Sequence, residues 1–342
     1  MTKRTMAGRR PQTVKSKRFT VASVAIAVRG SLDRRRPTPL VSTMHRMLLG
    51  VFAALCWASA LAAQPVPARD LWEFPLGAVL EPAALASEPG AGLWNPAMSA
   101  LAPGQRLRLG VASLATGVQQ GTDGQLLSAS YRRTSGTTVG LSVARASVAG
   151  LVRTDTDPQS IGEVAYSSLL ISATAARTIL PHVTAGVAVR WREGRADTDV
   201  DKAIAADLGV VLHDLPWRHA RVALASFLWR PGREIDDRPA FVAAADVRIV
   251  GDSAAREVRL GYTLNAVNRG AREHGPAVSA RFERVEARTA FVQTSAGSRS
   301  ISRIRTGLAV YYARYVVGVA REEGTSGLGP VYQFTLSSLL RQ

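Results

Sequence analysis

The chain has 342 residues, a formal net charge of +17 and 46% hydrophobic residues. Residues 1–63 hold twelve Lys and Arg and one acid, whereas the remainder holds 31 basic and 25 acidic residues. Because Arg and acids are interleaved over most of the chain, the composition excludes the continuous basic surface that nucleic-acid binding needs. We predict no nucleic-acid partner, and the length suits one large domain.

The N-terminal part divides into three segments. Residues 1–43 are Arg-rich and lack a sustained period, so we expect disorder there or a true start of translation at Met44 or Met47. Residues 44–63 have a short basic start, an apolar stretch and then small residues, which is the order of a secretory signal peptide. The chain's only cysteine lies in that stretch, so the mature protein would contain none. Residues 64–103 are rich in Pro, Ala and Gly and show no sustained alternation.

Residues 104–342 repeat one unit, an alternation of apolar with small or polar residues followed by a turn. Side chains alternate across a strand, so each unit predicts a strand with one apolar and one polar face. About fourteen units without a convincing helix predict an all-β, antiparallel, up-and-down barrel that spans a membrane. The predicted strands are residues 105–114, 125–134, 137–148, 163–178, 183–193, 202–212, 219–230, 241–250, 256–268, 276–284, 287–296, 301–312, 315–322 and 329–340.

The predicted connections alternate in length along the chain. The short ones are residues 135–136, 179–182, 213–218, 251–255, 285–286 and 313–314. The longer ones are residues 115–124, 149–162, 194–201, 231–240, 269–275, 297–300 and 323–328. Tight turns at one end and longer loops at the other are typical of an outer-membrane barrel, with the tight turns on the periplasmic side.

The two faces of the predicted strands differ in character. Bulky apolar residues such as Leu109, Val189 and Leu260 share one face, and small or charged residues share the other. An Arg at the middle of a bilayer would cost about 2–4 kcal/mol, so we expect the charged face to line the lumen. The arginines predicted to face the lumen are Arg106, Arg108, Arg190, Arg192, Arg259, Arg303 and Arg305.

Two interpretations of these lumen arginines stay open. One is a path for an anionic or amphipathic ligand. The other is ion pairing that fills and stiffens the barrel, with the acids Asp207, Asp246, Glu283 and Glu322.

The residues that carry enzymatic or metal chemistry form no recognisable pattern. None of the five histidines has a second His or Cys at metal-ligand spacing, and no motif selects a nucleophile among the serines. We therefore predict no enzymatic activity, no metal and no cofactor. Acidic clusters at Asp197, Asp199 and Asp201 and at Asp236–Asp237 indicate solvated loop charge, with divalent-cation binding as the alternative.

An aromatic-Asn-Pro-Ala motif, Trp94-Asn95-Pro96-Ala97, comes shortly before the first predicted strand. With the signal peptide before it and about fourteen strands after it, this region resembles the long-chain fatty acid transporter (FadL) superfamily and the related PorV-type outer-membrane proteins. In that superfamily the segment folds into the barrel mouth as a plug. The resemblance therefore implies a plug over residues 64–103, with the motif residues shaping its hatch.

The resemblance implies more than one function. The first is passive transport of a hydrophobic or amphipathic small molecule past the plug; the modest, polar loops favour this or a structural barrel. The second is a PorV-like barrel that binds a protein cargo or translocon, and the third is a structural barrel without transport. A soluble, secreted β-protein is a further alternative.

The expected location of the barrel is the outer membrane of a Gram-negative-type envelope. The expected partners are outer-membrane lipid and, during biogenesis, the barrel-assembly machinery. The last predicted strand, with Gly329, Tyr332 and Phe334, resembles the C-terminal signal that this machinery recognises.

Overall fold

A computed structural model describes residues 68, 71, 81–88, 92–101, 107–116, 121–154, 160–229, 240–267, 272–296, 299–323 and 329–340. The predicted leader (1–43) and signal peptide (44–63) lie outside the described residues, as does Arg106. The segment predicted as a plug, 64–103, is described in part. Within the described residues, no helix is long and apolar enough to cross a membrane.

The described part is built almost entirely of strands, with two short 3-10 helices before them. The helices are η2 (Ala83–Leu85) and η3 (Pro96–Ala100). The strands are β1 (Leu107–Thr116), β2 (Thr122–Arg132), β3 (Thr138–Val148), β4 (Val152–Thr154), β5 (Ser160–Glu163), β6 (Tyr166–Leu180), β7 (Val183–Ala196), β8 (Asp199–Leu215), β9 (Ala220–Trp229), β10 (Ala240–Ser253), β11 (Arg256–Val267), β12 (Arg272–Phe282), β13 (Val285–Ala296), β14 (Arg299–Tyr312), β15 (Tyr315–Glu322) and β16 (Val331–Leu340).

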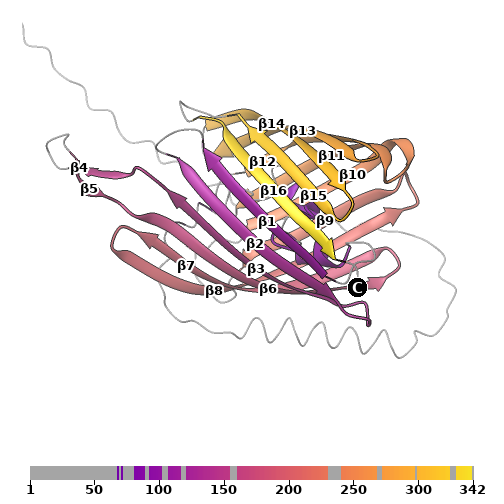
Figure 1. The fold of residues 1–342 in the computed structure, drawn as a ribbon, viewed down its shortest axis with the longest axis horizontal. Coiled ribbons are helices and arrows are strands. Elements are labelled where there is room, and N and C mark those ends of the chain that lie inside the picture. Colours follow the sequence, from indigo (N-terminus) through magenta and orange to yellow (C-terminus); the bar gives the residue numbers. More distant parts are fainter. Residues whose placement is uncertain are drawn as a thin grey trace, which may run out of the picture. The chain divides into compact units, whose positions relative to one another are not determined.

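Fourteen of these strands form one closed antiparallel barrel, which confirms the predicted fold class (Figure 1). Each barrel strand pairs with its neighbours in chain order, and β1 closes the ring against β16 from Leu107↔Leu340 to Thr116↔Val331. The strands β4 and β5 form a separate two-stranded sheet, so β3 pairs directly with β6. This hairpin lies in the connection that was predicted as the long loop 149–162.

The connections at the two ends of the barrel differ less in length than predicted. The connections predicted to be short are all short, but the longer loops predicted at 194–201 and 297–300 are wrong. Strands β7 and β8 are separated only by Asp197 and Thr198, and β13 and β14 only by two residues. Six residues of the predicted loop 194–201 instead pair within the extended ladder, from Gly194↔Asp201 to Ala196↔Asp199. Next to them, Glu193 and Lys202 lie opposite each other with 3.3 Å between Oε2 and Nζ.

The barrel is apolar on its outside and polar on its inside. Strand β15 alternates strictly between exposed and buried residues, and Val189 of β7 is 60% exposed between two buried neighbours. A protein in water rarely exposes a contiguous apolar surface larger than several hundred Å². An apolar outer band around a closed barrel is the arrangement that lipid requires, because closure also leaves no unpaired strand edge.

On β2–β8 a mainly polar row of outward-facing side chains bounds this outer band near the end of the barrel opposite the short turns. It consists of Gln125, Arg145, Glu193 and Lys202, with Leu169 of β6 between Arg145 and Glu193 in the register. At the short-turn end, large aromatic side chains are exposed, as interface girdles require. They are Trp217, Phe282, Tyr312 and Tyr315.

We predict that Val189→Arg destabilises the folded barrel in a bilayer by about 2–4 kcal/mol, because it places a charge in the middle of the apolar band. The matched control is Val200→Arg on β8, which points outward like Lys202 but lies beyond the polar row. The free energy of unfolding of both variants is measured by folding them into lipid vesicles across a urea series, with heat-modifiable gel migration as the readout of the folded fraction. Equal effects of the two substitutions would contradict the lipid-facing assignment.

Candidate functional site

Residues 81–88 and 92–101, here called the inner segment, pack against the inner faces of several strands. Helix η3 contacts β6, β7 and β8, and η2 contacts β9, β10 and β11. All residues of both helices are buried. The inner segment therefore occupies part of the space that the barrel encloses.

Two glycines of the barrel wall make room for the Asn95–Ala97 turn. A Cβ atom at Gly209 of β8 would lie 2.0 Å from Asn95 Oδ1, and one at Gly186 of β7 would lie 2.5 Å from Ala97 N. Asn95 caps η3, since its Oδ1 accepts from Ala97 N at 3.1 Å, and its Nδ2 donates to the Ala84 carbonyl at 2.9 Å. Only residues without a side chain at these two wall positions allow such close contact.

An aromatic and ionic contact fixes the same part of the inner segment. Trp94 stacks on Phe227 of β9 with 4.5 Å between ring centroids, and the Arg190 guanidinium lies 4.5 Å from the centroid of the same Phe227 ring. Arg190 Nε donates to Asp207 Oδ2 at 2.5 Å, and its Nη2 donates to the Leu93 carbonyl. Arg190 and Asp207 are both 0% exposed, so neither charge has water as a substitute partner.

The earlier part of the inner segment reaches different strands through carboxylates. Glu81 Oε1 lies 3.1 Å from Arg288 Nη2 of β13, and Glu88 forms an ion pair with Arg108 of β1. These pairs join the inner segment to strands that η2 and η3 do not cover. The segment is thus held by packing on β6–β11 and by charge on β1 and β13.

A cavity of about 670 Å³ lies between the inner segment and strands β10–β15. Asp214 near the end of β8 and the turn residues Ala254 and Ala313 line it, so it reaches the short-turn end of the barrel. Its charged lining is balanced between six arginines and six carboxylates: Arg108, Arg221, Arg259, Arg281, Arg288, Arg305, Glu81, Glu88, Asp214, Asp246, Glu257 and Glu286.

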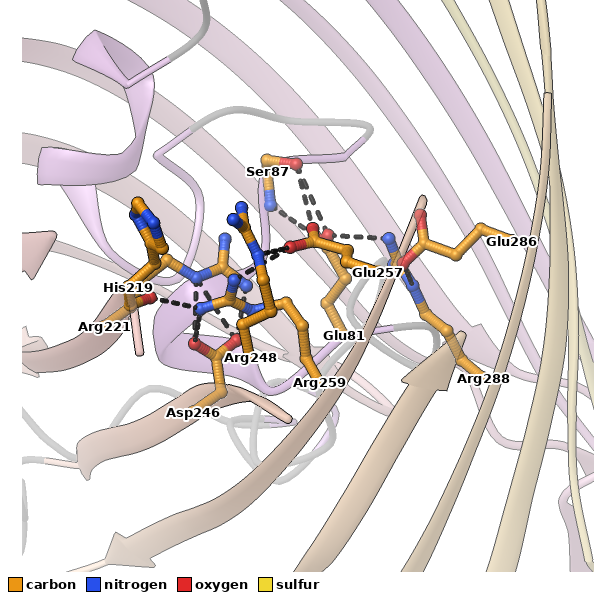
Figure 2. A network of polar contacts seen from close by, with 10 residues as sticks. All are labelled: Glu81, Ser87, His219, Arg221, Asp246, Arg248, Glu257, Arg259, Glu286 and Arg288. Carbon is orange, nitrogen blue, oxygen red and sulfur yellow. Dashed lines mark hydrogen bonds and ion pairs between the residues drawn. The ribbon is translucent and has the colours of Figure 1, made fainter. Parts of the chain in front are cut away.

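Most of these charges are paired along the wall (Figure 2). Asp246 accepts from Arg221 Nε at 3.0 Å and from Arg259 Nη2 at 2.7 Å. Glu257 pairs with Arg248 at 2.7 Å and with Arg259 at 3.1 Å. The result is a continuous chain of alternating charge across β9, β10 and β11.

A second ion-pair cluster lies on β12, β14 and β15, on the side away from the short turns. Glu273 is 2.8 Å from both Arg303 Nη2 and Arg305 Nη2, and Glu322 pairs with both arginines. Thr294 Oγ1 also accepts from Arg303 Nη2 at 2.7 Å. Because Arg305 also lines the cavity, this four-charge cluster bounds it toward the other end of the barrel.

The structure distributes the sequence-predicted site residues over these features. Arg108, Arg259 and Arg305 line the cavity, and Arg303 belongs to the four-charge cluster. Arg190 holds the inner segment, and Arg192 is buried on the same strand face, 1% exposed. The motif residues Trp94–Ala97 lie in the inner segment, docked on β7–β9.

Several residues of the site could not be found by reading the sequence. Glu81 and Glu88 lie in a segment without periodicity, and the alternation that marks Arg221 and Arg288 as inward-facing does not reveal their partners. Of the four acids expected to pair in the lumen, Glu283 does not. It is exposed in a turn at φ 53°, and its Oε1 pairs with Arg256 at the surface.

Among the described residues, no group of three or more His, Cys, Asp or Glu could hold a metal ion. The Asp197 carboxylate pairs instead with Arg153, and Asp201 accepts from Lys202 N at 2.8 Å. The predicted cluster at Asp236–Asp237 lies outside the described residues.

No family model and no curated protein match the sequence. Solved structures match the fold. The CymD monoaromatic hydrocarbon channel has a TM-score of 0.55 and 10% identity, over 76% of this chain and 95% of that chain. A TodX deltaS2S3 mutant, also a monoaromatic hydrocarbon channel, has a TM-score of 0.51 and 10% identity, over 73% of this chain and 94% of that chain. At such low identity, the likeness shows a shared barrel fold.

We predict that Gly209→Ala displaces the Asn95–Ala97 turn. The new methyl group would overlap with Asn95 and Pro96, and the strand that carries residue 209 is held in the sheet and cannot move away. Trypsin cleavage between the inner segment and β1 should become several-fold faster, while heat-modifiable migration shows an intact barrel. The control is Gly162→Ala in β5, where an added Cβ meets nothing within 4 Å. Unchanged cleavage in Gly209→Ala would contradict the docking described above.

Proposed function

We propose that this protein is an outer-membrane β-barrel of a Gram-negative-type envelope that passively transports a small amphipathic molecule. One observation carries the proposal: a closed barrel with an apolar outside encloses a cavity of about 670 Å³ beside a segment that fills only part of its interior. A barrel whose sole role is structural does not need a large charged cavity.

The family assignment supports this function. We propose membership of the FadL and PorV-like superfamily, on the basis of the motif at Trp94–Ala97, the strand number and the fold shared with two hydrocarbon channels. In this assignment residues 64–103 act as the plug. We propose no catalytic role, since the cavity's charged groups mainly pair with one another.

The proposed route follows from where the interior is filled. The inner segment packs on the inner faces of β6–β11, with its closest contacts at Gly186 of β7 and Gly209 of β8. The cavity lies beside it along β10–β15 and reaches the short-turn end. A solute would therefore pass between the inner segment and this wall, and would cross the four-charge cluster at the far side of the cavity.

A second candidate is a PorV-like barrel that binds a protein partner. The ordered hairpin of β4 and β5 favours it, because Leu151 and Val152 are exposed apolar residues on that connection. An ion pair between Arg153 and Asp197 holds the hairpin to the β7–β8 turn. A fixed loop with apolar residues is a suitable contact surface for another protein.

Expression from Met44 in a Gram-negative host tests the location. We expect an outer-membrane band that migrates differently before and after boiling. Purified protein in liposomes then tests transport, by the rate of vesicle swelling in isosmotic sodium benzoate and in arabinose.

We predict that Ala277→Trp slows this swelling several-fold, because Ala277 lines the cavity and the indole would occupy part of it. The control is Ala280→Trp on the same strand, whose side chain is exposed on the outer face, where aromatic residues suit a lipid interface. A folded outer-membrane barrel that swells vesicles no faster than protein-free liposomes would refute transport and favour the partner-binding or structural alternatives.

A further inference from the structure

We propose that Arg108 and Arg288 form a binding site for an oxyanion, and that Glu88 and Glu81 of the inner segment occupy it in the absence of solute. The ligand would be a small molecule with a carboxylate or phosphate group. This inference rests on the proposed transport function and names the substrate class of the cavity.

The contacts show why the two glutamates can act as internal substitutes for a ligand. Each carboxylate comes from the inner segment, and each guanidinium comes from a barrel strand that the helices of that segment do not cover. Glu81 Oε1 faces Arg288, while Glu81 Oε2 accepts from Ser87 Oγ at 3.3 Å. Arg288 Nε is held in place separately by Glu286 at 2.7 Å, so the guanidinium keeps its position when Glu81 leaves.

The Arg108 pair is incompletely satisfied, which points to a ligand. Arg108 is 6% exposed and lines the cavity, yet its Nε and Glu88 Oε2 have no hydrogen-bond partner among the described residues. Arg259 is 7% exposed and lines the same cavity, and its Nε also has no hydrogen-bond partner among the described residues. Buried donors without partners carry a free-energy cost, and an oxyanion with several acceptor oxygens would remove it.

The charge of the wall also favours an anion. Among the charged residues that line the cavity, the strands and their turns supply six arginines and four carboxylates, an excess of two positive charges. The two carboxylates of the inner segment, Glu81 and Glu88, neutralise that excess. When they turn away, the wall attracts anions into the cavity.

The inner segment can release these two carboxylates without leaving the barrel. Its later part is held by close packing at Gly186 and Gly209 and by the stacked Trp94, none of which involves Glu81 or Glu88. Leu85, Met98 and Leu101 add an apolar portion to the cavity lining. Benzoate, with one carboxylate and one apolar ring, is therefore a suitable probe.

The test measures binding of radiolabelled benzoate by equilibrium dialysis to the folded protein in a non-ionic detergent. We expect the Glu81→Gln/Glu88→Gln double variant to bind benzoate about tenfold more tightly, because the competing carboxylates are gone. Arg108→Gln/Arg288→Gln should lose binding. Glu283→Gln, which removes a surface carboxylate outside the cavity, should match the unsubstituted protein. Benzyl alcohol, the neutral analogue, should not compete.

Inorganic phosphate, added as a competitor, shows which part of benzoate supplies the affinity. If phosphate displaces benzoate, the oxyanion alone suffices for binding; if phosphate does not, the ring of benzoate contributes as well. Either result agrees with the proposal. Unchanged benzoate affinity in Glu81→Gln/Glu88→Gln, or competition by benzyl alcohol equal to that of benzoate, would overturn the site. If the double arginine variant does not fold, the benzoate affinity of the double glutamate variant still tests the site. Binding without vesicle swelling refutes transport alone, and swelling without binding refutes the site alone.

Discussion

Closure of the strand ladder between β1 and β16 is the constraint on which the other features depend. The two strands pair over the whole length of β1, so no barrel edge is left with unpaired backbone groups. In an apolar surrounding each unpaired group would cost several kcal/mol, and an open sheet would not be stable there. Closure also divides all side chains into two sets. Within the apolar outer band the outward side chains must be apolar, so a charged side chain at that depth has only the interior.

An interior that receives so many arginines must supply acids for them. A buried ion pair gains little net free energy, but a buried charge without its partner is strongly destabilising. Cross-strand register solves this within the wall, as in the pairs of Arg221 with Asp246 and Arg305 with Glu322. On β1 and β13 the register does not supply enough acids, and carboxylates of the inner segment take that role. The segment is thus part of the charge balance of the barrel as well as part of its filling.

The sequence predicts the barrel well because the signal is local and repeats. Alternation with period two places every barrel strand, even where the ends differ by several residues. It fails at 194–201, where Gly, Asp and Thr indicate a loop although the backbone pairs from Gly194↔Asp201 to Ala196↔Asp199. Asp197 and Thr198 alone make the β7–β8 turn, with Asp197 at φ 57°. Partners across the lumen lie far apart in sequence, as Glu81 and Arg288 do, so no local pattern could reveal them.

The shared fold leaves the choice of solute to the lining of the interior. Hydrocarbon channels share this barrel, but a fold hosts different functions, and the solute is determined by the groups it meets. A pure hydrocarbon in this cavity would separate arginines and carboxylates from water or from each other and would return no hydrogen bonds. A molecule with an oxyanion and an apolar body would satisfy Arg108 and lie against Leu85 and Met98 at the same time. The oxyanion ligand that we propose therefore follows from the charge of the wall and not from the shape of the barrel.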